Sequence, residues 1–231
     1  MQDWLSYRLS DLILFSPRTY YRMFELYHQA IWPAQLITVA LVVVILVLLR
    51  RGDAWRGAVI AALLAACWLW VAVAFQLRRY ATINWAARYF AALFVVQAAS
   101  LVWYGLVRRR VTFAHSRSNG TWLAPALFVL AVVLPPLAGW AADRTWKQVE
   151  LFGLSPDATT VATLGLLMMT SPNPPRALMI VPLSWCVIGG ATLWALESPE
   201  AWVLIGAGIV GLVAMLRRPR LTHAVPSGSD D

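Results

Sequence analysis

Long apolar stretches separated by short polar ones make up most of the chain from residue 32 onward. The stretch from Ile31 to Leu49, for example, contains no ionised side chain. About 20 apolar residues in a helix are enough to cross the roughly 30 Å of hydrocarbon in a bilayer. The pattern predicts seven membrane-spanning helices, at residues 32–49, 57–77, 86–107, 122–142, 158–170, 177–196 and 201–216.

The fifth predicted span is the shortest of the seven. Residues 158–170 would form only about 20 Å of helix, which is less than a full crossing requires. One interpretation extends this helix upstream through Ser155, Pro156 and Asp157. The other makes it a re-entrant segment that neighbouring helices shield from lipid, which would leave six crossings and both termini on one side.

The N-terminal segment, residues 1–31, has a different pattern. Apolar residues recur at a helical period through residues 3–15, among polar ones, and residues 18–28 combine arginine with several aromatic side chains. Such segments lie in the headgroup region of a membrane. Ser16 and Pro17 predict an N-cap followed by proline at the first helical position. The sequence therefore predicts an all-α fold, a polytopic bundle of transmembrane helices over residues 32–216. Amphipathic interfacial helices (1–31) precede it and a disordered tail (217–231) follows it.

Composition and charge support this assignment. Only 13% of the residues are charged, whereas soluble domains have about 25%. The net charge of +8 comes from 18 Arg and one Lys against 11 acids. In a soluble protein this excess would suggest nucleic acid. Here the arginines flank apolar stretches, where they set topology and contact phospholipid, so membrane lipid is the expected partner and nucleic acid is not.

The distribution of Lys and Arg between alternate loops predicts the orientation. Eleven lie in the tail and in the loops that share its side, and eight lie on the other side. The loop from Glu197 to Glu200 on that second side has two acids and no base. Because basic loops stay in the cytoplasm, we expect the N-terminus outside and the C-terminus in the cytoplasm.

The usual motifs of catalysis, metal binding and nucleotide binding are missing from the sequence. His28, His115 and His223 are scattered, and two cysteines are too few for a structural zinc site. A match to Gly-x-Gly-x-x-Gly at Gly206 lies inside an apolar helix, where small residues fit close helix packing better than a dinucleotide. No cofactor or metal is therefore expected.

What remains are polar residues near or within the predicted spans, which are costly in a bilayer and therefore informative. The candidates for a polar vestibule are Glu25, His28, Asn84, Arg88, Gln97, Asp143 and Glu150. Simpler roles exist for most of them: Asn84 could cap a helix, Arg88 could extend to the interface, Gln97 could bond a neighbouring helix, and the loop charges could be solvated. The alternative is that the loop from Asp143 to Asp157 folds over a vestibule lined by Glu25 and His28.

Several segments carry a resemblance to a known family. They are Tyr27-His28-Gln29-Ala30-Ile31-Trp32-Pro33-Ala34-Gln35, Ile83-Asn84-Trp85-Ala86-Ala87 with Gln97, Phe152-Gly153-Leu154-Ser155-Pro156 with Thr159, Thr160 and Gly165, Pro174-Pro175-Arg176, and Gly189-Gly190. The chain resembles a bacterial family of predicted multi-pass membrane proteins known only as a domain of unknown function. Some members are labelled permeases. The family pattern has Asn at the position of His28 and Cys at that of Ser155, which argues against either residue as a metal ligand.

The resemblance implies a multi-pass protein of the bacterial inner membrane. Two functions compete: a permease for a small solute or ion, suggested by the proline-broken spans and the candidate vestibule, and an accessory subunit of a membrane complex. Thirteen tryptophans, many at span ends, and small-residue faces suit a protein that binds other membrane proteins or a second copy of itself. An intramembrane enzyme is the least favoured, because no acid, base and nucleophile share one depth.

Overall fold

The computed structural model describes residues 15–50, 53–113, 122–141, 143–170 and 175–216. Its elements, in chain order, are α1 (Pro17–Ala30), α2 (Ala34–Leu49), α3 (Ala54–Trp70) continued by η3 (Val71–Leu77), η4 (Tyr80–Thr82), α4 (Ala87–Val102) continued by η5 (Trp103–Val107), α5 (Leu123–Ala141), η6 (Trp146–Gln148), α6 (Pro156–Met168), α7 (Arg176–Ala195) and α8 (Ala201–Leu216). The described residues contain no β-strand, only one isolated bridge between Phe113 and Thr170. The predicted all-helical fold is confirmed.

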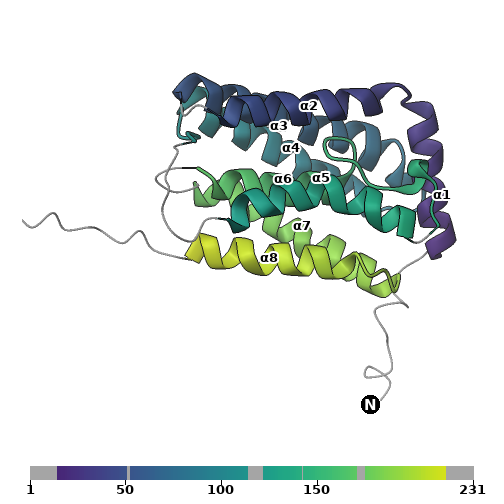
Figure 1. The fold of residues 1–231 in the computed structure, drawn as a ribbon. Coiled ribbons are helices and arrows are strands. Elements are labelled where there is room, and N and C mark those ends of the chain that lie inside the picture. Colours follow the sequence, from purple (N-terminus) through teal and green to yellow (C-terminus); the bar gives the residue numbers. More distant parts are fainter. Residues whose placement is uncertain (1–14, 51–52, 114–121, 142, 171–174, 217–231) are drawn as a thin grey trace, which may run out of the picture.

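The long helices run side by side and α1 lies across one end of them (Figure 1). α1 meets α2 at a bend of 87°. Successive long helices from α2 to α8 alternate in direction along the bundle (Figure 1). The predicted segment at residues 3–15 and the tail at 217–231 lie almost entirely outside the described residues.

By length and composition, four helical segments could each cross a membrane: Trp55–Thr82, Ala87–Val107, Leu123–Ala141 and Arg176–Ala195. A fifth is added if the bent pair of α1 and α2 counts as one span. The other predicted spans coincide with the shorter helices α6 and α8. Apolar helices of this kind are compatible with a membrane protein.

Aromatic packing attaches α1 to the end of the bundle. Ser16 caps the helix as predicted, accepting a hydrogen bond from Thr19 N at 3.3 Å, with Pro17 in the first turn. The rings of Phe24 and Tyr27 are buried against Phe75, with centroids 5.0 and 5.4 Å away. Pairs of this kind add about 0.5–1.5 kcal/mol beyond the area they bury. α1 is therefore part of the core and not a loosely attached surface helix.

α6 is the central helix of the bundle, and nearly all of its side chains are buried. At Gly165 it approaches the backbone of α5 so closely that an added Cβ would lie 2.7 Å from Phe128 N. On its other side, Trp68 Nε1 donates a hydrogen bond to Thr163 Oγ1 at 2.9 Å. Because protein surrounds α6, this helix of 13 residues does not have to meet lipid along its length.

A proline in α7 explains one polar contact between helices. Pro182 lacks the N–H that would otherwise bond the carbonyl of Leu178, four residues earlier. Gln97 of α4 supplies the missing donor, with its Nε2 at 3.0 Å from Leu178 O. The amide thereby joins α4 to α7 inside the bundle.

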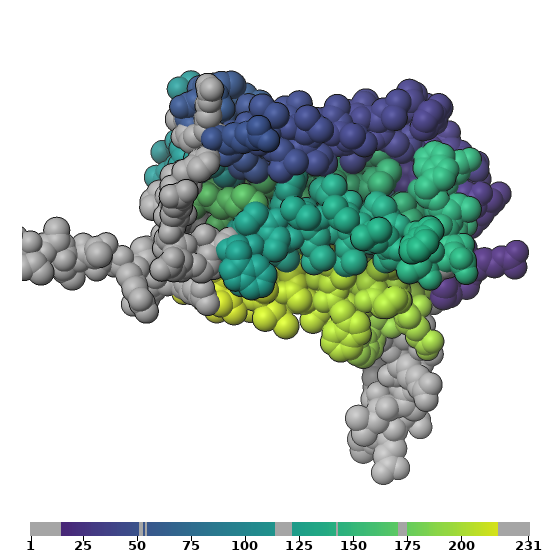
Figure 2. Space-filling view, in the orientation of Figure 1, coloured from purple at the N-terminus to yellow at the C-terminus, as the bar shows by residue number. Residues whose placement is uncertain are grey.

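Much of the outer surface is apolar. Figure 2 shows one face, on which α2, α5 and α8 lie in turn. Exposed side chains along these helices include Ile37, Val39, Val133, Leu137 and Ile209. An apolar exterior around a core of the same character is what a lipid-facing bundle requires.

Candidate functional site

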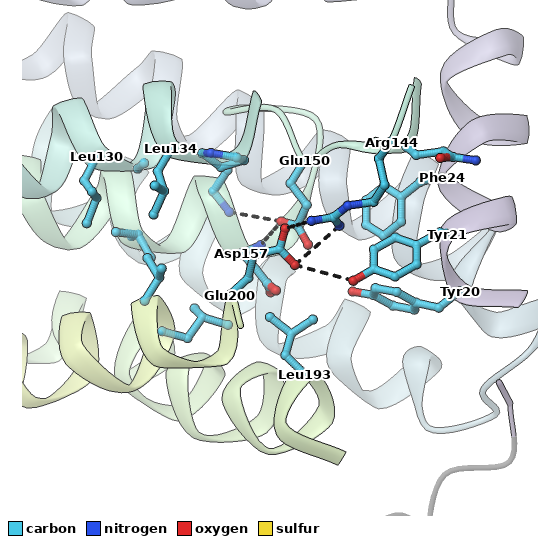
Figure 3. A pocket seen from close by; sticks show the side chains of 17 residues that line it. Tyr20, Tyr21, Phe24, Leu130, Leu134, Arg144, Glu150, Asp157, Leu193 and Glu200 are labelled. Carbon is cyan, nitrogen blue, oxygen red and sulfur yellow. Dashed lines mark hydrogen bonds and ion pairs between the residues drawn. The ribbon is translucent and has the colours of Figure 1, made fainter. Parts of the chain in front are cut away.

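A cavity of about 50 Å³, here called the inner cavity, lies beneath α1 at the end of the bundle. Figure 3 shows aromatic side chains of α1 along one side, leucines of α5 further in, and carboxyl groups between them. Its polar residues are Tyr20, Tyr21, Arg144, Gln148, Glu150, Asp157 and Glu200. A water molecule needs about 10–15 Å³ of such space. The inner cavity can therefore hold a few waters or one very small solute.

Two carboxyl groups meet at the start of α6. Glu150 Oε2 accepts hydrogen bonds from the backbone N–H groups of Asp157 and Ala158, at 3.1 and 3.2 Å. These are unpaired donors of a helix N-terminus, whose partial positive charge also favours an anion. The loop after α5 thus brings Glu150 to the first turn that carries Asp157.

Only one carboxylate oxygen of Asp157 has a hydrogen-bond donor among the described residues. Its Oδ1 accepts a hydrogen bond from Trp185 Nε1 of α7 at 2.7 Å, and Trp185 in turn packs edge-on against Phe94 of α4. Its Oδ2 is buried and finds no hydrogen-bond donor among the described residues. Asp157 and Glu150 both line the inner cavity.

The electrostatics of the pair follow from this placement. Removal from water raises the pKa of Glu150 well above its ordinary value, and the negative charge of Asp157 raises it further. Two carboxylates in one site cannot both ionise at low cost, and a proton shared by the pair would supply the donor that Asp157 Oδ2 lacks. The arrangement can hold one proton at the base of the inner cavity.

An ion pair closes the cavity on the side of α8. The guanidinium of Arg144 pairs with Glu200 and stacks over the ring of Tyr21, 4.6 Å from its centroid. The hydroxyl of Tyr21 donates to Ser198 Oγ at 3.2 Å and to Glu200 at 3.4 Å. Arg144 is thus engaged with Glu200, and the structure gives it no bond to Glu150 or Asp157 among the described residues.

A second, open depression of about 650 Å³ lies beside the inner cavity, between α1 and the connection from η3 to α4. We call it the arginine basin, because Arg18, Arg22 and Arg79 line it. Tyr21 and Gln148 line both spaces. These two side chains therefore form the wall between the open basin and the carboxyl pair.

Of the residues predicted to line a vestibule, two line one of these spaces and the others do not. Glu25 lines the arginine basin, where it pairs with Arg22 at 2.8 Å and accepts from Gln148 Nε2 at 3.3 Å. Glu150 lines the inner cavity. His28 is fully buried instead, with Nδ1 at 2.8 Å from the carbonyl oxygen of Lys147, and burial lowers its pKa.

The remaining candidates lie apart from both spaces. Asn84 precedes α4, where its side chain accepts from Ala86 N at 3.0 Å. Arg88 and Asp143 are exposed, and Asp143 has a left-handed φ of 52°. Gln97 bonds α7, as described above. The loop after α5 does contact α1, through Lys147 at His28 and Gln148 at Glu25. Of the predicted vestibule residues, however, only Glu150 lines the inner cavity and only Glu25 lines the arginine basin.

Of the polar residues of the inner cavity, only Glu150 was proposed as a candidate from the sequence. The others, which were not proposed, are Tyr20, Tyr21, Arg144, Gln148, Asp157 and Glu200. Asp157 follows Ser155-Pro156, a signal for a helix start, and an acid at such a position is ordinary. Only the fold brings Trp185 and Glu150 to it. Within the described residues no group of three His, Cys, Asp or Glu side chains could hold a metal ion.

Comparison with known proteins gives a family without a known activity. The chain belongs to a family of unknown function, DUF6064, whose profile matches residues 18–225. No curated protein and no solved structure matches it.

Proposed function

We propose that this chain is an integral membrane protein of the bacterial inner membrane that crosses the bilayer seven times, with α1 at the outer surface. The alternating directions of α2 to α8 support this topology (Figure 1). So do arginines at the ends remote from α1, among them Arg50, Arg108, Arg110 and Arg176, because basic residues mark the cytoplasmic side. We count α6 as a crossing because it runs in the opposite direction to both α5 and α7 (Figure 1).

We further propose that the protein is a proton-linked permease for a small solute. The observation that carries this proposal is the Glu150–Asp157 pair, with one buried carboxylate oxygen lacking a donor, at the base of a cavity next to an open basin. Buried ionisable groups without a charge partner are costly to keep, and in a cavity they are candidates for a functional site. The wall of Tyr21 and Gln148 would have to move for a solute to pass.

Transport by purified protein in vesicles tests the permease. The vesicles carry an internal pH dye and receive, one at a time, inward gradients of a panel of small solutes. A solute that wild-type protein carries should change the internal pH, and Glu150→Gln and Asp157→Asn should abolish that change. Glu197→Gln is the matched control, because Glu197 is exposed at the same end of the bundle. Equal proton movement in all four proteins would refute a role for the pair.

A second function, an accessory subunit, is favoured by α2. Of its residues Gln35, Thr38, Ile45 and Leu48 are buried, whereas its exposed side chains are apolar and include Leu36, Ile37, Val39, Val43 and Val47. A partner helix could cover that face as well as lipid can. The test is purification from native membranes. If another membrane protein copurifies in a fixed ratio, and no longer does so when exposed α2 residues are changed to alanine, the accessory-subunit function is supported over the permease.

A further inference from the structure

The arginine basin has the chemistry of an anion site. Its lining holds three guanidinium groups, from Arg18, Arg22 and Arg79, and a single carboxylate, Glu25. Glu25 pairs with Arg22, at 2.8 Å. The described residues offer no ion-pair partner to Arg18 or Arg79. The lining therefore keeps an excess of two positive charges.

The walls of the basin come from two separate parts of the chain. α1 contributes Arg18 and Arg22, and the turn that follows η3 contributes Arg79. That turn is fixed internally, because Thr82 donates to the carbonyl oxygen of Arg79 at 2.6 Å. α1 is fixed by its buried aromatic face, including Phe24 and Tyr27. The arginines thus extend from rigid backbone, which lowers the ordering cost of binding a ligand between them.

Arginine is suited to one class of ligand in particular. Its planar guanidinium matches the oxygens of phosphate and carboxylate groups in paired hydrogen bonds. We propose that the arginine basin binds an anion with a phosphate or carboxylate group, which Arg18 and Arg79 contact from opposite walls. The group could belong to a free solute or to the headgroup of an anionic lipid. The inference stands whether or not the protein transports anything.

Inorganic phosphate is the probe for a free anion. Purified full-length protein in a non-ionic detergent is unfolded by heat in increasing sodium phosphate, against sodium chloride of equal ionic strength. Phosphate should stabilise the wild-type protein beyond chloride. Arg79→Gln should weaken the apparent affinity about tenfold, the loss expected for one charge-assisted contact. Arg79→Lys keeps the charge and should lose less.

Lipid nanodiscs test the other source of the anion. Wild-type protein and Arg79→Gln are compared in discs of phosphatidylcholine alone and of phosphatidylcholine with phosphatidylglycerol. Stabilisation by phosphatidylglycerol but not by phosphate, lost in Arg79→Gln, would assign the basin to lipid headgroups. Stabilisation by phosphate would assign it to a free anion.

A variant at the end of the bundle remote from the arginine basin provides the control for both experiments. Arg108→Gln removes an exposed arginine that lies outside the basin, so its response to both anions should equal that of the wild type. Should Arg79→Gln fail to fold, Arg18→Gln at the opposite wall replaces it. If neither anion stabilises the protein, or if Arg108→Gln loses the effect as fully as the basin variants, the inference is wrong.

Discussion

Replacing Gln97 by leucine tests the contact that compensates for Pro182. The substitution removes a hydrogen bond of 3.0 Å and leaves the carbonyl of Leu178 without a donor. It also removes Gln97 Oε1, which is buried and has no partner among the described residues. Interhelical hydrogen bonds in membranes contribute about 0.6 kcal/mol on average and up to about 1.7. We expect a net loss of about 1 kcal/mol, because the orphaned carbonyl adds to the cost and the lost amide oxygen reduces it.

A second substitution separates this mechanism from a general packing defect. Pro182→Ala restores a backbone N–H that can bond the carbonyl of Leu178 within α7. In that background Gln97→Leu should cost less than about 0.5 kcal/mol, the scatter usual for independent sites. Reversible unfolding by sodium dodecyl sulfate in mixed micelles, followed by circular dichroism, measures the free energy of unfolding of all four proteins. Equal costs of Gln97→Leu in both backgrounds would refute the reasoning.

Gln76 provides a contrast within the same chain. It is fully buried in η3, and neither atom of its amide has a hydrogen-bond partner among the described residues. Replacing a buried unpaired polar group by an apolar one of similar size is neutral or stabilising. Gln76→Leu should therefore leave the free energy of unfolding unchanged or raise it, in the same assay in which Gln97→Leu lowers it. A clear loss would mean that the Gln76 amide has a partner in the membrane.

Three further predictions concern the site and the central helix. Because burial raises the pKa of Glu150, the contribution of this group to stability should be fully present below the ordinary pKa of glutamate and lost as pH rises through the raised one. Glu150→Gln should remove this loss in pH-dependent unfolding. Gly165→Ala should lower thermal stability by about 1–3 kcal/mol through overpacking, whereas Gly206→Ala, with nothing within 4 Å of the added Cβ, should not. Arg144→Gln should cost about 1 kcal/mol or more in chemical unfolding by leaving Glu200 unpaired, and Glu200→Gln in the same background should recover part of it.

The helices could be predicted from the sequence because hydrophobic length is a local property. The predicted segments at 32–49, 158–170 and 201–216 correspond to α2, α6 and α8. What could not be predicted is how α6 is enclosed, since nothing local distinguishes a short spanning helix from a buried one. Its burial depends on Gly165 meeting α5 and on Trp68 meeting Thr163, both of them contacts between distant parts of the chain.

The site was predictable only in part, for the same reason. Glu25 and Glu150 were candidates because they are charged residues beside apolar segments. Arg88 and Asp143 satisfied the same criterion but are exposed. Asp157 was not among the candidates, although the fold buries it against Trp185. Whether a charged residue is solvated or enclosed depends on which loop covers it, and the sequence pattern does not contain that information.

The start of α6 explains why the carboxyl pair should carry a single negative charge. Glu150 accepts hydrogen bonds from two N–H groups of the helix terminus, and Trp185 donates a hydrogen bond to one carboxylate oxygen of Asp157. The partial charge of a helix N-terminus is about half an elementary charge, enough to favour one carboxylate but not two. Arg144, the cation in the lining of the inner cavity, is paired with Glu200. A second ionised carboxyl would therefore remain uncompensated, so that this pair should gain and lose one proton as a unit, within the lining of the inner cavity that also includes Tyr21 and Gln148.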